Sequence, residues 1–343
     1  MFKKIRVQDA VGETLSHDIT EIRPGEFKGA AFRKGHTVCD EDICHLQKLG
    51  KNHLYLIDLE KDEIHENQAA AILAKGLAGP GITWKDDPKE GKICLYAKTD
   101  GLLVVDKANL AAFNMVDEVM CASLHSYTLV KKGQQVAATR AIPLVMNRTP
   151  VERAASIAQQ NGGTVFVHPL KNSKIGIVIT GNEVFNGLID DKFAPILNKK
   201  IVELGSTVSE IAFAPDDESL IQQAIEKHID NGCDLILLSG GMSVDPDDVT
   251  RKGIQKAGAS EMHYGAAALP GAMFMVAYIG GIPILGVPAC GLHHKVTVLD
   301  LILPRVLIGE HIGKKELAFI GHGGLCMDCP ECTHPHCPFG KGM

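Results

Sequence analysis

Apolar runs and amphipathic stretches alternate regularly between residues 173 and 309. The runs KIGIVIT and DLILLS are continuous and apolar, as expected of strands that are buried in a parallel sheet. The stretches between the strands carry apolar residues at helical spacing, most clearly from the acidic pair Asp216 and Asp217 to Gly232. This alternation predicts a doubly wound α/β domain, in which ligands bind beyond the carboxyl ends of the strands.

The stretch DLILLSGGMSVDPDDVT, residues 234–250, combines a strand, a glycine pair and the predicted start of a helix, with Pro246 at the first helical position. The N-cap candidates are Ser243, Asp245, Asp247 and Asp248. Glycines let a ligand approach the backbone, and a helix N-terminus attracts an anion. Carboxylates beside an anion indicate a bridging divalent cation, for which Mg²⁺ is the usual ion. The alternative is an ordinary capped helix that binds no ligand.

Two further segments complete this domain. The segment MFMVAYIGGIPILGVP predicts a hairpin around residues 279–282. A closing helix is predicted to begin near Cys290 or Gly291, directly after a glycine and proline turn. Such a helix start would give the crevice a second N-terminus that faces an anion.

Residues 1–172 predict a mixed α+β region that is rich in strands. A short helix is expected between Asp40 and Gly50, and a second over residues 63–77. A loop rich in Gly, Pro and charge indicates a subdomain boundary near residues 80–90. From residue 92 to 146, alternating runs separated by Thr-Asp-Gly and Lys-Lys-Gly turns predict hairpins.

Composition and charge argue against some classes of function, including binding to nucleic acid and insertion into a membrane. The 343 residues suggest two or three domains, and 45% hydrophobic with 22% charged residues indicates a globular protein. The net charge of -6 and the lack of a dense Lys/Arg block argue against nucleic acid as a partner. No apolar stretch approaches the length of a membrane span and the first residues have no apolar signal-peptide core, so we expect a cytoplasmic protein without membrane association.

Four of the ten cysteines fall within twelve residues of the C-terminal tail, residues 310–343. They are Cys326, Cys329, Cys332 and Cys337. Thiolates at this spacing can bind Zn²⁺ or an iron-sulfur cluster, and His334 and His336 favour zinc. The alternative is a reduced tail without a metal, since disulfides are rare in the cytosol.

Four spaced motifs within residues 173–309 carry a family resemblance. They are TGNE at Thr180–Glu183, G-x-I-x-D at Gly187–Asp191, PDD at Pro215–Asp217, and SGGMS with DDVT between Ser239 and Thr250. Together they resemble the molybdopterin-binding domain of molybdenum-cofactor biosynthesis. The GGMS form, the later LPG and GVPACG segments and the VGETLSHDIT start resemble the multidomain molybdopterin molybdenumtransferases.

The resemblance implies a three-layer α/β domain over 173–309 that binds molybdopterin or adenylyl-molybdopterin, with Mg²⁺ and molybdate. It implies molybdate insertion with release of AMP, a homo-oligomer, and partners among other cofactor-biosynthesis proteins or apo-molybdoenzymes. The ligand-binding residues that it implies are Thr180, Gly181, Glu183, Asp216, Ser239, Gly240, Gly241, Ser243, Asp245, Pro288 and Gly291. The catalytic residues that it implies are Asp191 and Asp248, with Asp248 also holding Mg²⁺.

Three departures from the family pattern leave a second function open. Ala272 stands where the transferases carry a lysine in a Pro-Gly-Lys-Pro segment, and Asp245 stands where a glycine is common. The segment GVPACG, residues 286–291, stands where they carry Gly-x-Pro-Gly-Asn-Pro. The nearby pair His293 and His294, or Lys295, could supply the missing cation. The alternative function is a non-catalytic cofactor carrier or sensor. A nicotinamide-dependent oxidoreductase is not supported, because no GxGxxG follows the first strand.

Overall fold

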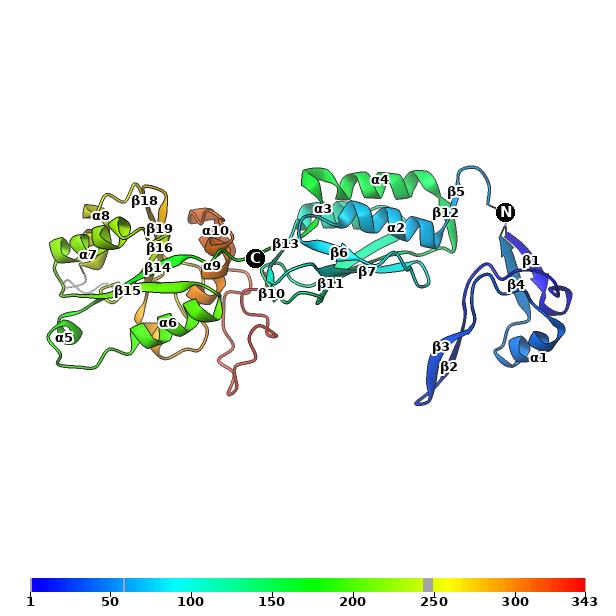
Figure 1. The fold of residues 1–343 in the computed structure, drawn as a ribbon, viewed down its shortest axis with the longest axis horizontal. Coiled ribbons are helices and arrows are strands. Elements are labelled where there is room, and N and C mark those ends of the chain that lie inside the picture. Colours follow the sequence, from blue (N-terminus) through cyan, green and yellow to red (C-terminus); the bar gives the residue numbers. More distant parts are fainter. Residues whose placement is uncertain (1, 58, 243–248, 343) are drawn as a thin grey trace. The chain divides into compact units, whose positions relative to one another are not determined.

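The computed structural model describes residues 2–57, 59–242 and 249–342, and the chain divides into two compact units (Figure 1). Unit 1 comprises residues 1–98, 105–124 and 132–166, and unit 2 comprises residues 99–104, 125–131 and 167–343. Within the described residues, no helix combines the length and the apolar character that crossing a membrane would require.

A six-stranded sheet in the order β15-β14-β16-β19-β18-β17 forms the centre of unit 2. Its strands are β14 (Lys174–Thr180), β15 (Thr207–Ala214), β16 (Leu235–Ser239), β17 (Glu261–Tyr264), β18 (Met275–Ile279) and β19 (Ile282–Val287). The first four strands in this order are parallel, whereas β18 and β17 run antiparallel to their neighbours. The hairpin predicted around residues 279–282 is thereby confirmed as β18 and β19.

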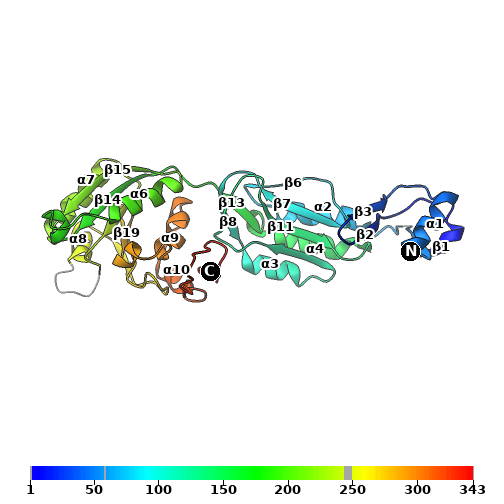
Figure 2. The same ribbon diagram turned by 90° about the horizontal axis from the view of Figure 1, so that it is seen from below.

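Helices cover both faces of this sheet (Figure 1 and Figure 2). The helices of the domain are α5 (Asn182–Phe185), α6 (Phe193–Glu203), α7 (Glu218–Asp230), α8 (Thr250–Lys256), α9 (Val298–Leu307) and α10 (Lys314–Phe319). On β14, Ile175, Ile177 and Ile179 pack in the core with α6 and α9, whereas Val178 packs in a separate core with α7 and α8. Because side chains alternate across a strand, this division gives three layers and confirms the predicted α/β class.

One helix start differs from the prediction, and another falls outside the described residues. Helix α8 is described from Thr250 with Val249 at its N-cap, and the predicted first position, Pro246, is not among the described residues. The closing helix α9 begins at Val298 rather than near Cys290, and Thr297 and Asp300 form its capping box. Residues 289–292 form a 3₁₀ turn instead. The second anion-facing helix N-terminus predicted at Gly291 is therefore wrong, because the polar cap at Thr297, six residues later, starts the helix with better hydrogen bonds.

The parallel strands place their carboxyl ends at one edge of the sheet. Since β18 runs antiparallel to β19, the segment before β18, residues 269–274, reaches the same edge. The turn between β18 and β19 at Gly280 and Gly281 lies at the opposite edge. Ligand-facing loops therefore come from both parallel and antiparallel strands.

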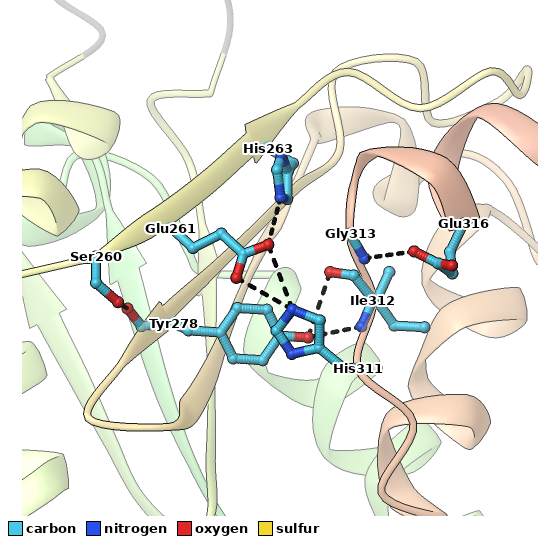
Figure 3. Close-up of polar contacts among 8 residues, drawn as sticks. All are labelled: Ser260, Glu261, His263, Tyr278, His311, Ile312, Gly313 and Glu316. Carbon is cyan, nitrogen blue, oxygen red and sulfur yellow. Dashed lines mark hydrogen bonds and ion pairs between the residues drawn. The ribbon is translucent and has the colours of Figure 1, made fainter.

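A polar cluster joins β17 to the segment that follows α9 (Figure 3). Nε2 of His263 and Nε2 of His311 donate to the Glu261 carboxylate, at 2.6 Å and 3.1 Å. The His311 ring stacks on Tyr278, with ring centroids 4.2 Å apart. The hydrogen bonds from His263 and then His311 lower the pKa of Glu261. These contacts fix the chain just before Gly313, whose N–H donates to Glu316 at 2.9 Å at the start of α10.

Unit 1 holds the N-terminal elements and a four-stranded sheet in the order β6-β7-β11-β9. Its elements are β1 (Phe2–Arg6), β2 (Ile19–Arg23), β3 (Phe27–Phe32), α1 (Asp40–Lys48), β4 (His53–Ile57), β5 (Glu63–His65), α2 (Glu66–Leu77), β6 (Ile82–Trp84), β7 (Lys92–Ala97), α3 (Lys107–Asn114), β9 (Val119–Ser123), β11 (Gln135–Ala141), β12 (Val145–Asn147) and α4 (Arg148–Ala158). The helix predicted between Asp40 and Gly50 is confirmed as α1.

The hairpins predicted at the Thr-Asp-Gly and Lys-Lys-Gly turns are wrong. Strand β8 (Gly101–Val105) lies between β10 (Leu129–Val130) and β13 (Val165–His168), whereas β7 lies between β6 and β11. Strands that are adjacent in sequence therefore lie in different sheets. The alternating pattern predicts a strand from local residues, but its partner depends on contacts that are distant in the chain.

Candidate functional site

The loops after β14, β15 and β16 meet at the carboxyl edge of the sheet in unit 2. The Asn182 N–H donates to the Asp216 carboxylate at 3.0 Å, and the Asp216 N–H donates to the Asn182 side-chain oxygen at 3.2 Å. The Gly181 N–H donates to the Ala214 carbonyl at 3.2 Å. These contacts bring two of the predicted loops together in one crevice, as parallel strand order requires.

Buried hydroxyl groups support the floor of this crevice. The Thr180 hydroxyl donates to the Ser239 carbonyl at 3.2 Å and lies 2.9 Å from the Thr250 hydroxyl. All three residues are buried. The Ser239 hydroxyl is itself buried without a hydrogen-bond partner among the described residues. A buried hydroxyl without a hydrogen-bond partner destabilises the folded protein. Such a hydroxyl is consistent with a site whose polar ligand supplies the missing partner.

The glycine pair Gly240 and Gly241 lies on this floor with φ angles of +98° and +55°. A Cβ at Gly240 would lie 2.2 Å from the Thr180 carbonyl oxygen, and a Cβ at Gly241 would lie 2.3 Å from the Thr250 hydroxyl. Only glycine fits both positions, so the chain presents bare backbone to the crevice. Both glycines line each of the two cavities described next.

The first cavity, called the acidic lobe here, has a volume of about 700 Å³. It extends from the glycine pair along the loop of residues 179–193, and its lining carboxylates are Glu183, Asp190, Asp191 and Asp216. Among its described lining residues, Lys192 is the single basic one. This excess of carboxylate oxygens suits a hard divalent cation more than a free anion.

Asp191 has a structural role that the motif did not reveal. Its Oδ1 accepts a hydrogen bond from the Phe193 N–H at 2.8 Å, and its Oδ2 accepts one from the Ala194 N–H at 2.9 Å. These are donors of the first turn of α6, so Asp191 caps that helix. Both oxygens are engaged, although each keeps a lone pair.

The second cavity, called the apolar lobe here, has a volume of about 630 Å³. Its lining residues are Gly240, Gly241, Met242, the segment 269–273, Pro288, Ala289, Cys290, His294, Leu325, Cys326 and Asp328. The predicted ligand residue Pro288 therefore reaches the crevice, but Gly291 lines a different cavity together with His293 and Lys295. Of the three candidates for the missing cation, the structure places only His294 in the same lobe as Ala272.

Three lining residues of the apolar lobe come from the C-terminal tail, and sequence reasoning missed them. They are Leu325, Cys326 and Asp328. The sequence pattern of the tail indicates a function only for its cysteines and for His334 and His336. Nothing in its local pattern indicates where it docks, because docking depends on pairing with a segment more than fifty residues earlier.

The four tail cysteines differ in their surroundings. Cys326 and Cys337 pack against the hydrophobic core, whereas Cys329 is exposed. In the part of the chain that the structure describes, no group of three His, Cys, Asp or Glu residues is arranged to hold a metal ion. The tail metal stays a prediction. Three of the predicted site residues, Ser243, Asp245 and Asp248, lie outside the described residues.

Two family descriptions match parts of the chain. Residues 176–307 match the family described as "Probable molybdopterin binding domain". Residues 4–58 match a family described as a domain of unknown function, DUF8806.

Several curated proteins are similar to a short part of the chain. A CinA-like protein of Mycolicibacterium gilvum is 37% identical over 79 residues, which are 23% of this chain and 19% of that protein. A CinA-like protein of Mycobacterium tuberculosis is 34% identical over 79 residues, which are 23% of this chain and 18% of that protein. The chain therefore spans about a fifth of the length of these relatives.

Solved structures with a similar arrangement include two proteins of low identity. The CinA protein of unknown function from Thermoplasma acidophilum is 19% identical, with a TM-score of 0.36, over 40% of this chain and 99% of that one. The molybdopterin biosynthesis MoeA protein from Pyrococcus horikoshii is 18% identical, with a TM-score of 0.34, over 72% of this chain and 79% of that one.

Proposed function

Residues 176–307 belong to the family of molybdopterin-binding domains, and from this premise we propose that the crevice around Gly240 and Gly241 binds a molybdopterin species. One observation carries the proposal. Two lobes of opposite character, one acidic and one apolar, share the same glycine pair. A ligand with a phosphate group at one end and a fused ring at the other needs this combination.

Mg²⁺ fits the acidic lobe through the chemistry of its donors. Protein sites commonly hold Mg²⁺ by one or two carboxylates, with substrate phosphates and water completing the shell. Glu183, Asp190 and Asp216 line the lobe, and we propose that two of them hold the ion. When bound, Mg²⁺ neutralises phosphate charge and polarises the phosphorus–oxygen bonds. Asp191 acts differently in this proposal, because it positions the loop through its two helix-capping hydrogen bonds.

The finer proposal is Mg²⁺-dependent insertion of molybdate, with adenylyl-molybdopterin hydrolysed and AMP released. In this reaction the glycine pair lets the phosphates approach the backbone closely, since a side chain at either position would collide with Thr180 or Thr250. The carboxylates of the acidic lobe orient the metal and the attacking group, and Asp248 is proposed to share this role. The ring end of the ligand lies in the apolar lobe, where apolar side chains contact its faces.

The test is to incubate the purified chain with adenylyl-molybdopterin, Mg²⁺ and molybdate, and to measure released AMP and bound pterin in the same sample. The discriminating variant is Asp216→Asn, which removes the charge but keeps an oxygen to accept the Asn182 N–H. A matched control is Asp230→Asn at the far end of α7. We expect molybdate-dependent AMP release that falls at least tenfold in Asp216→Asn and not in the control. Full activity in Asp216→Asn would remove this carboxylate from the metal site.

A second candidate function is a non-catalytic carrier or sensor that delivers the cofactor to an apo-molybdoenzyme. Ala272 lines the apolar lobe without the charge that a lysine would supply, and both oxygens of Asp191 are engaged by backbone N–H groups. These two observations favour binding over turnover. Retained pterin without AMP release would support the carrier. We also propose a homo-oligomer, which light scattering of the purified chain tests directly.

A further inference from the structure

The C-terminal tail forms a wall of the apolar lobe. Leu325, Cys326 and Asp328 line this cavity together with residues 269–273, and Leu325 pairs with Leu269. The domain match ends at residue 307, so these lining residues lie beyond it. The tail is thus part of the crevice, although it lies outside the matched domain.

Backbone hydrogen bonds fix the tail against the domain. The Leu269 N–H donates to the Gly324 carbonyl at 2.8 Å, and the Cys326 N–H donates to the Leu269 carbonyl at 2.8 Å. Gly324 allows this approach, because a Cβ there would lie 2.4 Å from the Ala267 carbonyl oxygen. Further along, Phe339 is 2% exposed and packs in the hydrophobic core. Two anchors therefore hold the tail on both sides of Asp328.

Asp328 is chemically distinct within the apolar lobe. It is the single carboxylate among the described lining residues, and His294 is the single basic group. Its backbone has a φ of +50°, a left-handed conformation that Asp adopts more readily than most residues. The other described lining side chains are aliphatic, thioether, thiol or imidazole groups, and none of them accepts a hydrogen bond as strongly as a carboxylate.

We propose that Asp328 binds the donor edge of a pterin ring, where a ring N–H and an exocyclic amino group lie side by side. This inference rests on the proposed function and names the end of the ligand that each lobe takes. A carboxylate can accept two parallel N–H hydrogen bonds from such an edge, as it does from a guanidinium group. The apolar side chains of Leu269, Met273 and Leu325 suit the faces of a flat fused ring.

The proposal also sets the direction of the ligand in the crevice. With the ring edge at Asp328, the phosphate end crosses the glycine pair Gly240 and Gly241 and enters the acidic lobe. The negative charge of the phosphate then lies beside the proposed Mg²⁺ rather than beside Asp328. The reverse direction would place a phosphate next to the Asp328 carboxylate, and the two negative charges would repel each other.

The experiment compares two ligands on two variants of the full chain. The ligands are a pterin with a phosphate on its side chain, and the corresponding 2,4-dioxopteridine, in which an oxygen replaces the exocyclic amino group. The variants are Asp328→Asn and, as a matched control, Glu331→Gln, an exposed tail carboxylate that does not line the lobe. Fluorescence titration of the pteridine ring gives the Kd in each case, and the metal content of each protein is measured alongside.

We expect Asp328→Asn to weaken binding of the pterin by roughly tenfold to a hundredfold, the usual size for hydrogen bonds to a charged group. Binding of the dioxo compound should change little, and Glu331→Gln should leave both ligands unaffected. Unchanged pterin affinity in Asp328→Asn, or an equal loss for both ligands, would overturn the assignment of Asp328. If the unmodified chain binds neither ligand, the proposed function itself fails.

Discussion

Replacing Gly240 by alanine tests whether the floor of the crevice has room for a side chain. The residue has a φ of +98°, and its Cβ would lie 2.2 Å from the Thr180 carbonyl oxygen and 2.6 Å from the Thr180 hydroxyl. Thr180 cannot move away easily, because its hydroxyl is bonded to the Ser239 carbonyl and lies against Thr250. The substitution therefore strains the backbone and crowds two strands at once.

The expected cost can be divided into two parts. A left-handed backbone costs an alanine about 1–2 kcal/mol, and crowding in a packed interior costs about 1–3 kcal/mol. The sum is about 2–5 kcal/mol, a large fraction of the stability of an ordinary domain. Gly232 supplies the matched control, since its φ is +71° and no atom lies within 4 Å of a Cβ placed there. Gly232→Ala should show the backbone cost alone.

Hydrogen exchange is the suitable assay, because it reads each unit separately. The single tryptophan, Trp84, belongs to unit 1, whereas the crevice belongs to unit 2. Exchange of the slowest amides in β14 and β16 reports the stability of unit 2. We expect Gly240→Ala to lose about 1–3 kcal/mol more than Gly232→Ala. Equal losses in the two variants would refute the argument that close contact with Thr180 requires glycine.

Three further predictions concern other parts of unit 2. Asp191→Ala should destabilise α6 by about 1 kcal/mol through loss of its cap, whereas Asp191→Asn should recover part of this in the same exchange assay. Burial lowers the pKa of His228 below 6.5, so its stabilising contribution is lost as the pH falls below that value. Denaturation at several pH values should show this loss, and His228→Gln should reduce it. We propose that the tail cysteines hold Zn²⁺ or an iron-sulfur cluster, so elemental analysis should find metal that Cys329→Ser loses.

The elements that sequence reasoning predicted correctly are those set by local residues. Helix α7 is an example, because Asp217 accepts hydrogen bonds from the Ser219 and Leu220 N–H groups while Ile221 and Ile225 are fully buried. The acidic cap and the apolar spacing of that helix are visible in the sequence. The same holds for the continuous apolar strands β14 and β16, whose residues are buried on both faces.

One feature of the crevice depends on a distant contact and was not predictable in this way. Leu325 lines the crevice only because the tail pairs with Leu269. Two other differences concern local helix caps. Asp191 matches a family motif, but its carboxylate caps α6 through the N–H groups two and three residues later. Gly291 is a plausible helix start, yet Thr297 provides the cap that α9 uses. In both cases the local pattern fits more than one arrangement.

The antiparallel direction of β18 offers a practical means of labelling the protein. Its turn with β19 lies at the edge of the sheet opposite the crevice, and a Cβ at Gly280 or Gly281 would meet no atom within 4 Å. A dye or a short epitope inserted there would extend into open space without touching the glycine floor. Fluorescence of a dye at that turn would then report association of the chain with a second copy or a partner, while the crevice stays accessible to its ligand.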